Sequence, residues 1–335
     1  MKRGGLILAT TVDQAFIEFL KDKVNLDPNI TTKARSSRDN LIENIKGFSG
    51  DDDFFTTYND RILKFGSFAK KTKIRELDDI DMMFCLSADG RTYTELTDGF
   101  EINGVQADKD NSLCIDDTYK LNSTKVINRF ISKLEELNDY KKSDMKKNHE
   151  AATLQLKSYT WNFDIVPCFY TTSDIYLIPD GKGNWKKTDP RIDADNVSTI
   201  NQKHKGKVLN VIRLTKYWNR YNSTVTITSY LLETMILNYY NNLIESENYW
   251  VDLEFKNVLQ YLSNEILNDV ADPKGIQGNI NLFSIDDRLK ISKKAKDCYD
   301  KACEASTSEL TDKDQESAIN KWGEILGDEF PKYEE

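Results

Sequence analysis

The chain has 335 residues, of which 30% are charged, 39% hydrophobic and 11% aromatic. This composition is typical of a folded globular protein rather than a disordered one, and the length predicts two packed lobes. A net charge of -9 and a pI near 5.1 argue against a surface that follows a long polyanion. We therefore expect no extended nucleic-acid partner.

Cysteine usage and apolar segments indicate the compartment. The five cysteines are scattered and form no CxxC pair, which favours reduced thiols over a disulfide framework or a zinc site. The amino terminus has only a short apolar run, Leu6 to Ala9, without a cleavage-site pattern. No segment offers the roughly 18 apolar residues that a membrane span needs. We expect a cytoplasmic protein without a signal peptide or a membrane partner.

The amino-terminal half combines helical and strand patterns. Apolar side chains recur every three to four residues over 12–24 and 32–45, which predicts two helices. Residues 61–86 change to the β-prone runs ILKFGSF and DIDMMFCL, which predict two strands joined by a basic connector. A polar loop or hairpin is expected next, and a helix over 118–137. The charged residues 138–150 read as a solvated loop.

Strand patterns return at ATLQLKSY and WNFDIVPCFY, and DIYLIPDGKGNWKKTDP predicts a hairpin with its turn at Asp180–Gly183. Beyond about Asn196 the periodicity is helical: VLNVIRLTKYWNR, SYLLETMILNYYNNL, DLEFKNVLQYLSNEIL, RLKISKKAKDCYDKACEA and ESAINKWGEILGDEF. This order predicts an α+β protein. Its sheet-rich lobe, with the amino-terminal helices, would span residues 1–195 and its helical lobe residues 196–335.

Two carboxylates in DDIDMMFCL suggest a metal site. The two-residue period of a strand places Asp79 and Asp81 on one face and Ile80 on the other, with the aspartate Cα atoms about 7 Å apart. Mg²⁺ favours a few carboxylates together with substrate phosphates. Two such ions about 4 Å apart would activate a hydroxyl and stabilise departing pyrophosphate. The alternative is an edge strand with a polar face, although Asp is unfavourable in strands.

A third carboxylate strengthens this hypothesis. Asp164 lies in WNFDIVPCFY between apolar neighbours, and a strand there places it on one face with Asn162 and Val166. On a neighbouring strand it would complete a metal site with Asp79 and Asp81. Read alone, Asp164 is equally compatible with a hydrogen-bonded core position, because buried carboxylates need partners. The hypothesis therefore depends on all three carboxylates.

Several other residues could contact phosphate. The stretch FGSFAKKT ends a predicted strand with Gly66 and Ser67, where backbone N–H groups could approach a triphosphate or simply form a turn. Lys216 lies on the apolar flank of its predicted helix, so its ammonium must meet an anion or extend to solvent. Ser229 lies where the next helix should begin, and its hydroxyl would cap that helix or share its amino end with phosphate.

These motifs occur in a specific order. GSFAKKTKIRELDDID, followed by FDIVP, RLTKYWN and SYLLE, resembles the template-independent nucleotidyltransferases of the polymerase-β superfamily. Together with ITTKARSSRDNLIENI, IPDGKGNWKKTDPR and WGEILGDEFPK, it is most similar to the bacterial cGAS/DncV-like nucleotidyltransferases (CD-NTases, SMODS type) of antiphage defence, over nearly the whole chain. The resemblance implies a polymerase-β-like nucleotidyltransferase core with a mixed sheet, packed against a carboxy-terminal helical lobe as in oligoadenylate synthases.

The resemblance also implies roles for individual residues. Asp79 and Asp81 would bind two Mg²⁺ ions, for which Mn²⁺ could substitute, and Asp164 would bind the ion that activates the attacking ribose hydroxyl. The implied nucleotide contacts are Gly66, Ser67, Lys71, Thr72, Lys216, Ser229 and Tyr230. The first two would hold the donor phosphates, and Tyr230 would stack on a base. Around Lys71 and Thr72, AKKTKIREL carries Lys where relatives often carry Arg or Gly.

The implied activity is the joining of two or three nucleoside triphosphates, ATP among them, into a cyclic second messenger of antiphage (CBASS) signalling. The resemblance further implies a monomer and a regulatory protein partner from a defence operon. Two alternatives stay open. A linear oligonucleotide synthase or an RNA-tailing transferase would share the three carboxylates, and a catalytically silent nucleotide-binding module would share the fold.

Overall fold

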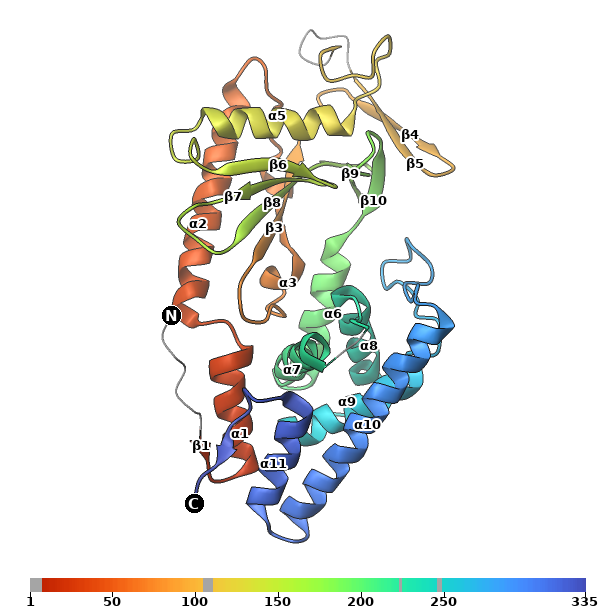
Figure 1. Ribbon diagram of the computed structural model, residues 1–335. Helices are drawn as coiled ribbons and strands as arrows, with labels where there is room; N and C mark the ends of the chain where they lie inside the picture. The colour runs from red at the N-terminus through yellow and green to blue at the C-terminus, as the bar shows by residue number, and fades with distance from the viewer. Residues whose placement is uncertain (1–7, 105–110, 223–224, 246–248) are drawn as a thin grey trace. The chain divides into compact units, whose positions relative to one another are not determined.

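Residues 8–104, 111–222, 225–245 and 249–335 are described by the computed structural model (Figure 1). The chain forms two compact units. The helical unit consists of residues 1–27, 72–76 and 195–335, and the sheet unit consists of residues 28–71 and 77–194. As a division into domains, 1–195 and 196–335 stays a prediction. The compact units instead group the first helix and residues 72–76 with the carboxy-terminal helices.

The sheet unit is built on a nine-stranded sheet in the order β2-β3-β8-β9-β10-β5-β4, to which β7 adds by pairing with β8 and β6 by pairing with β7. The strands are β2 (Leu63–Phe65), β3 (Asp79–Leu86), β4 (Thr92–Leu96), β5 (Gly99–Asn103), β6 (Asp144–Asn148), β7 (Ala151–Gln155), β8 (Asn162–Tyr170), β9 (Tyr176–Pro179) and β10 (Trp185–Thr188). Strands β3 and β8 run parallel, whereas β2 and β7 pair with them in the antiparallel sense. The predicted mixed sheet is confirmed.

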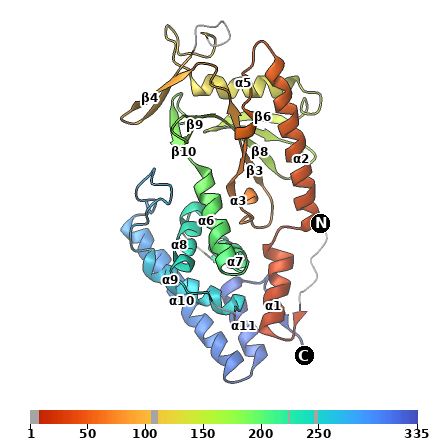
Figure 2. The same cartoon turned by 180° about the vertical axis from the view of Figure 1, so that it is seen from behind.

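Helices α2 (Pro28–Lys46) and α5 (Ser123–Glu136) lie alongside this sheet (Figures 1 and 2). The even positions of β3 are buried on the face that packs against α5, where the Phe84 ring lies 6.0 Å from the Phe130 ring. The odd positions lie on the other face, where Asp79 and Asp81 are half-buried and Met83 and Cys85 are buried. The single turn α3 (Gly66–Ala69) directly follows β2, and two 3₁₀ segments lie at Gly47–Gly50 and Asn59–Arg61.

One predicted loop is a strand. Within the charged residues 138–150, Asp144–Asn148 form β6, which pairs with β7 in antiparallel register. The expectation of a solvated loop was wrong because backbone hydrogen bonds to β7 stabilise an extended segment whose alternate side chains stay exposed. Charged side chains are common on such edge strands, where they discourage pairing with another chain. The polar stretch after β3 contains a hairpin, β4–β5, and β9–β10 form the hairpin predicted around Asp180–Gly183.

The helical unit confirms the predicted carboxy-terminal helices. It contains α1 (Val12–Phe19), a π-helical turn (Leu20–Val24), α6 (Pro190–Lys203, which begins in the sheet unit), α7 (Val208–Asn222), α8 (Ser229–Asn241), α9 (Val251–Glu265), α10 (Ile285–Leu310) and α11 (Gln315–Leu326). Short strands β1 (Leu8–Ala9) and β11 (Lys332–Tyr333) pair in parallel. The Phe16 ring lies 5.0 Å from the Trp322 ring, so α1 belongs to this core.

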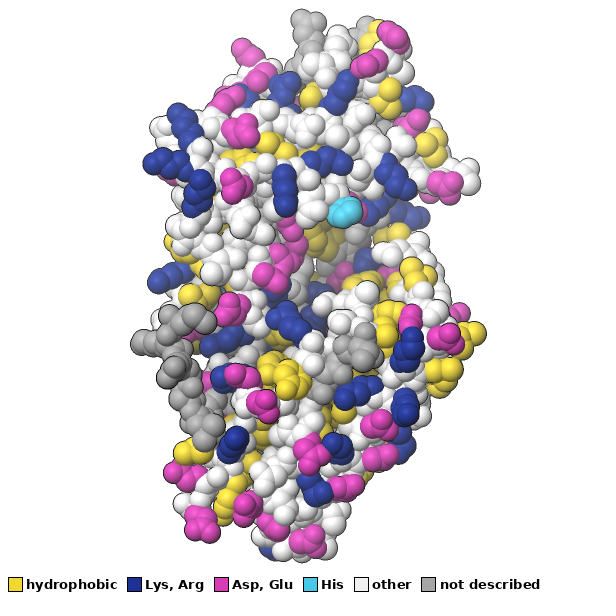
Figure 3. Space-filling model, in the orientation of Figure 1, with side chains coloured by type: hydrophobic (Ala, Val, Ile, Leu, Met, Phe, Trp, Pro, Cys, Tyr) yellow, Lys and Arg dark blue, Asp and Glu magenta, His cyan; other side chains and the backbone are white. Residues whose placement is uncertain are grey.

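The cysteines and the surface charges are as the sequence suggested, with free thiols and charges of both signs (Figure 3). All five cysteines are free thiols, and four of them are buried. On the face drawn in Figure 3, Lys and Arg side chains lie interspersed with Asp and Glu side chains. Among the helices that the structure describes, none is both long enough and apolar enough to cross a membrane.

Candidate active site

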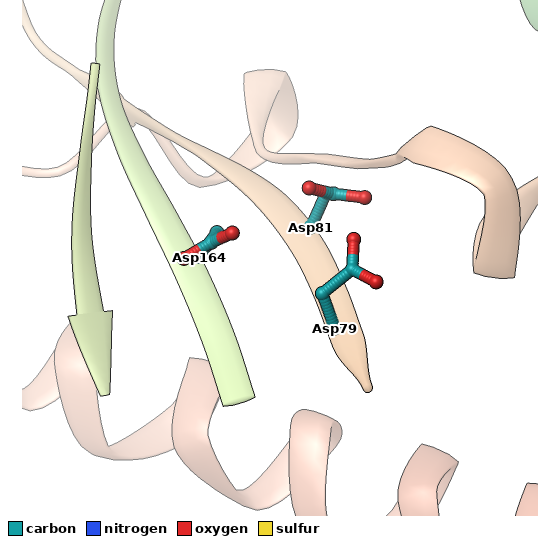
Figure 4. Close-up of side chains that lie close together, drawn as sticks. All are labelled: Asp79, Asp81 and Asp164. Atoms are coloured by element: carbon teal, nitrogen blue, oxygen red, sulfur yellow. The ribbon is translucent and has the colours of Figure 1, made fainter. Parts of the chain in front are cut away.

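Three carboxylates meet on one face of the central sheet. Asp79 and Asp81 extend from β3, and the parallel register places Asp81 opposite Asp164 and Asp79 opposite Asn162 on β8. One oxygen from each of the three aspartates can be chosen so that all lie within 4.8 Å of one another. Figure 4 shows the three side chains extending from the two adjacent strands. The three carboxylates are half-buried, and together they form the group that the sequence predicted.

The Asp164 carboxylate has a partner on its other side. Strand β7 pairs Thr153 with Asp164, and the Thr153 hydroxyl donates a hydrogen bond of 2.5 Å to Asp164 Oδ1. The Thr153 side chain is buried. Sequence analysis missed this residue, because ATLQLKSY reveals a strand but not which of its side chains faces Asp164.

The glycine–serine turn lies against the same cluster. Phe65, the last residue of β2, is paired with Asp81, so the chain passes beside the Asp81 carboxylate as it enters α3. Gly66 has a φ of +73°, and a Cβ at this position would overlap the Asp81 carboxylate. Only glycine combines this backbone conformation with so close an approach. The structure therefore brings Gly66 and the half-buried Ser67 next to the carboxylates.

The segment that follows this turn passes from the sheet unit to the helical unit between Lys71 and Thr72. Lys71 is exposed and belongs to the sheet unit, whereas Thr72 is fully buried in the helical unit. The carbonyl and hydroxyl oxygens of Thr72 accept hydrogen bonds of 3.2 and 3.3 Å from Lys216 Nζ. The phosphate contacts expected of Lys71 and Thr72 stay predictions.

Lys216 meets the anion that its position on an apolar helix flank requires. Its ammonium is buried and lies 2.7 Å from Glu233 Oε2 on α8. A charge out of contact with water is tolerated only when it is paired and hydrogen-bonded, and Glu233 and Thr72 meet that demand. Sequence analysis missed Glu233, although the sequence SYLLETMIL places this single charged residue within an otherwise uncharged helical run.

The amino end of α8 differs in detail from the expectation. Ser229 is the first residue of the helix rather than its cap, because Thr228 occupies the cap position. Thr228 makes no side-chain cap hydrogen bond there, and Ser229 is exposed. The next residue, Tyr230, donates a 2.5 Å hydrogen bond to Asp272 Oδ1, and Lys274 Nζ lies 3.9 Å from the centre of its ring.

Asp272 ties a loop to this helix end. Backbone N–H groups of Lys274, Ile276 and Gln277 donate to its carboxylate in addition to the Tyr230 hydroxyl. Burial alone would raise the pKa of Asp272, but these hydrogen bonds outweigh it and hold the pKa below its usual value. The network orders the loop and fixes the Tyr230 side chain.

A cavity of about 250 Å³ lies at the opposite end of the two parallel strands. Its lining includes Arg91, Tyr93, Phe169 and Leu177, and it contains none of the three aspartates. Tyr170 in the cavity wall lies six positions beyond Asp164 on β8, which is about 20 Å along a strand. The carboxylate site and this cavity are therefore separate features of the sheet unit.

Comparison with known proteins identifies the family. Residues 98–201, which include Asp164, match the Second Messenger Oligonucleotide or Dinucleotide Synthetase domain, SMODS. A Bacillus cereus (strain VD146) protein named "probable cyclic nucleotide synthase" is 41% identical over 338 residues, covering 98% of this chain and 100% of that protein. The chain therefore belongs to the SMODS-type cyclic nucleotide synthases, the bacterial cGAS/DncV-like nucleotidyltransferases.

Solved structures share the fold. A chain of the Escherichia coli MS115-1 CdnC:HORMA-deltaN complex matches with a TM-score of 0.71 at 18% identity, over 95% of this chain and 98% of that one. Vibrio cholerae DncV cyclic AMP-GMP synthase, in complex with the linear intermediate 5' pppA(3',5')pG, matches with a TM-score of 0.65 at 12% identity, over 96% and 98%. The nucleotidyltransferase architecture implied by the sequence motifs is confirmed.

Proposed function

We propose that the protein is a cyclic oligonucleotide synthase of antiphage (CBASS) signalling. It would join nucleoside triphosphates, ATP among them, into a cyclic di- or trinucleotide and release pyrophosphate at each step. The observation that carries the proposal is the carboxylate triad beside the Gly66 turn. The name of the Bacillus cereus relative and the linear intermediate held by DncV support the same reaction.

The triad fits Mg²⁺. Its donors are all carboxylate oxygens, which suit a hard divalent cation that completes its shell with water and substrate phosphates. Asp79 and Asp81 would hold two Mg²⁺ ions, or Mn²⁺ in their place, and Asp164 would hold one of the two. When bound, the ions would activate the attacking hydroxyl and neutralise charge on the departing pyrophosphate.

The chain's own residues would position the nucleotides. Gly66 approaches the Asp81 carboxylate closely, and the backbone N–H groups of Gly66 and Ser67 would hold the donor phosphates. From the helical unit, Lys216 and Ser229 would contact the triphosphate and Tyr230 would stack on a base, with Lys71 and Thr72 as further phosphate contacts. In such transfers catalysis comes mainly from positioning and charge neutralisation.

A regulatory protein is the proposed partner. CdnC, which shares the fold, was solved in complex with HORMA-deltaN. By analogy, a protein from the same defence operon would bind this enzyme and control its activity.

Turnover with defined triphosphates tests the proposal. We expect incubation with Mg²⁺ and mixed nucleoside triphosphates to release pyrophosphate and to yield a phosphatase-resistant product, whose mass gives ring size and bases. Asp79→Ala combined with Asp81→Ala should abolish turnover. Asp116→Ala, which removes an exposed carboxylate of the same unit, should not. A product with free ends would instead establish a linear synthase, and a folded protein without turnover would be a silent module.

A further inference from the structure

We propose that Thr153 is a positioning residue, which fixes the Asp164 carboxylate in the orientation that divalent metal binding requires. This inference rests on the proposed function, because it assigns Asp164 to the metal site. It adds a residue from a third strand, β7, to a site whose ligands come from β3 and β8.

The contact is specified by the fold. Antiparallel register places Thr153 directly opposite Asp164, and the hydroxyl donates to Oδ1 at 2.5 Å. A threonine in a strand has a stiff first side-chain torsion, because its β-carbon is branched. Thr153 as a whole is only 5% exposed, so water has little access to compete for the bond. The donor is therefore held in one place, and the acceptor with it.

Fixing one oxygen of a carboxylate limits rotation of the whole group. With Oδ1 held by Thr153, Oδ2 has a defined direction relative to Asp79 and Asp81, which lie across the parallel strand pair. Hydrogen bonds of this kind orient metal ligands in many proteins, and their loss typically weakens metal binding about 10–100-fold.

Gly66 gives the site a second constraint. Its close approach confines the Asp81 carboxylate from the side of β2, while Thr153 confines Asp164 from the side of β7. The two ligands that face each other across β3 and β8 are thus each held from outside the pair. Such preorganisation lowers the entropic cost of closing a metal site.

Metal binding without turnover tests the role. Mn²⁺ would be titrated into the nucleotide-free protein, with free Mn²⁺ measured by electron paramagnetic resonance. Thr153→Val keeps the shape of the side chain and removes its hydroxyl, and we expect its dissociation constant for Mn²⁺ to rise at least about 10-fold. Thr153→Ser keeps a donor and should bind within about threefold of the wild type. Thr171→Val is the matched control, because Thr171 is a buried threonine whose hydroxyl bonds Ile175 instead.

The outcomes separate this inference from the proposed function. If Thr153→Val binds Mn²⁺ as tightly as the wild type, or if Thr171→Val weakens binding equally, Thr153 has no positioning role. The metal site is tested by comparing wild type with Asp164→Asn. If the wild type binds no Mn²⁺, or if Asp164→Asn binds it equally well, Asp164 is not a metal ligand, and both the proposed metal site and the role of Thr153 are wrong. Circular dichroism would check folding of each variant. Should Thr153→Val not fold, Thr153→Ala must give the same weakening of Mn²⁺ binding.

Discussion

Asp81 and Asp164 lie directly opposite each other in the parallel pair β3–β8, although 83 positions separate them in the sequence. Asp79 is two residues from Asp81 on the same strand and therefore on the same face. Parallel neighbours in register present their side chains on one face at the spacing between strands, about 5 Å. One long-range pairing thus converts a local DxD pattern into a three-carboxylate site.

Gly66→Ala should inactivate the enzyme. The new Cβ would overlap the Asp81 carboxylate, and the positive φ would cost about 1–3 kcal/mol in a residue other than glycine. We expect pyrophosphate release to fall at least about 100-fold. Gly47→Ala is the control, since open space surrounds that position, and it should retain activity. An active Gly66→Ala variant would mean that the turn does not confine Asp81.

The Lys216–Glu233 pair should contribute to stability as a unit. Removing one partner of a buried ion pair leaves an uncompensated charge, so Lys216→Met should lower the free energy of unfolding by about 3–5 kcal/mol. Replacing Glu233 by Leu in the same molecule should restore much of that loss. Urea unfolding of both single variants and the double variant measures the coupling. Additive losses would show that the two side chains act independently.

An exposed ion pair is the control for that experiment. Lys205 and Glu245 lie 3.0 Å apart with both side chains about half exposed. Lys205→Met should change the free energy of unfolding by no more than about 1 kcal/mol. If Lys205→Met lowered the free energy of unfolding as much as Lys216→Met, burial could not explain the large effect of the Lys216 substitution.

Asp272 should give the loop an acid-sensitive contribution to stability. Its pKa is lowered in the folded state, so its contribution is present above the unfolded value of about 3.9 and is lost as pH falls through the folded pKa. The difference in unfolding free energy between wild type and Asp272→Asn should therefore be constant near neutral pH. It should shrink below about pH 4. A difference that grows on acidification would contradict the assigned sign.

Tyr230→Phe isolates the hydroxyl in the same network. It removes one of the donors to the Asp272 carboxylate and should lower the free energy of unfolding by about 1.5–3 kcal/mol, as for hydrogen bonds to charged groups. The phenyl ring keeps its stacking surface, so a role of this ring against a base predicts little change in the KM for triphosphates. A large rise in that KM without loss of stability would assign the hydroxyl itself to substrate binding.

Thiol reactivity should distinguish one cysteine from the rest. Burial, reinforced by the neighbouring Cys85 thiol, raises the pKa of Cys168, and burial also raises the pKa of Cys298. Cys303 is half-exposed, whereas the other four are buried. Ellman's reagent should therefore titrate about one thiol in the native protein and all five in denaturant. Rapid reaction of several native thiols would contradict the described burial.

Local patterns in the sequence predicted most of the elements. Helical periodicity identified α7 to α11, and alternation around Asp79 and Asp81 identified β3 together with the face on which its carboxylates lie. Turn-forming residues identified the glycine–serine turn and the β9–β10 hairpin. Such features depend on neighbouring residues alone, which is why they can be read before the fold is known.

Only the tertiary structure decided which distant residues meet. The register of β8 against β3 joins Asp164 to Asp81, and that of β7 against β8 joins Thr153 to Asp164. Glu233 is known as the partner of Lys216 only because α7 and α8 pack together, and β6 is a strand only because β7 pairs with it. A one-residue shift in any strand pairing reverses its faces without changing local propensity, and the burial of whole faces selects the register.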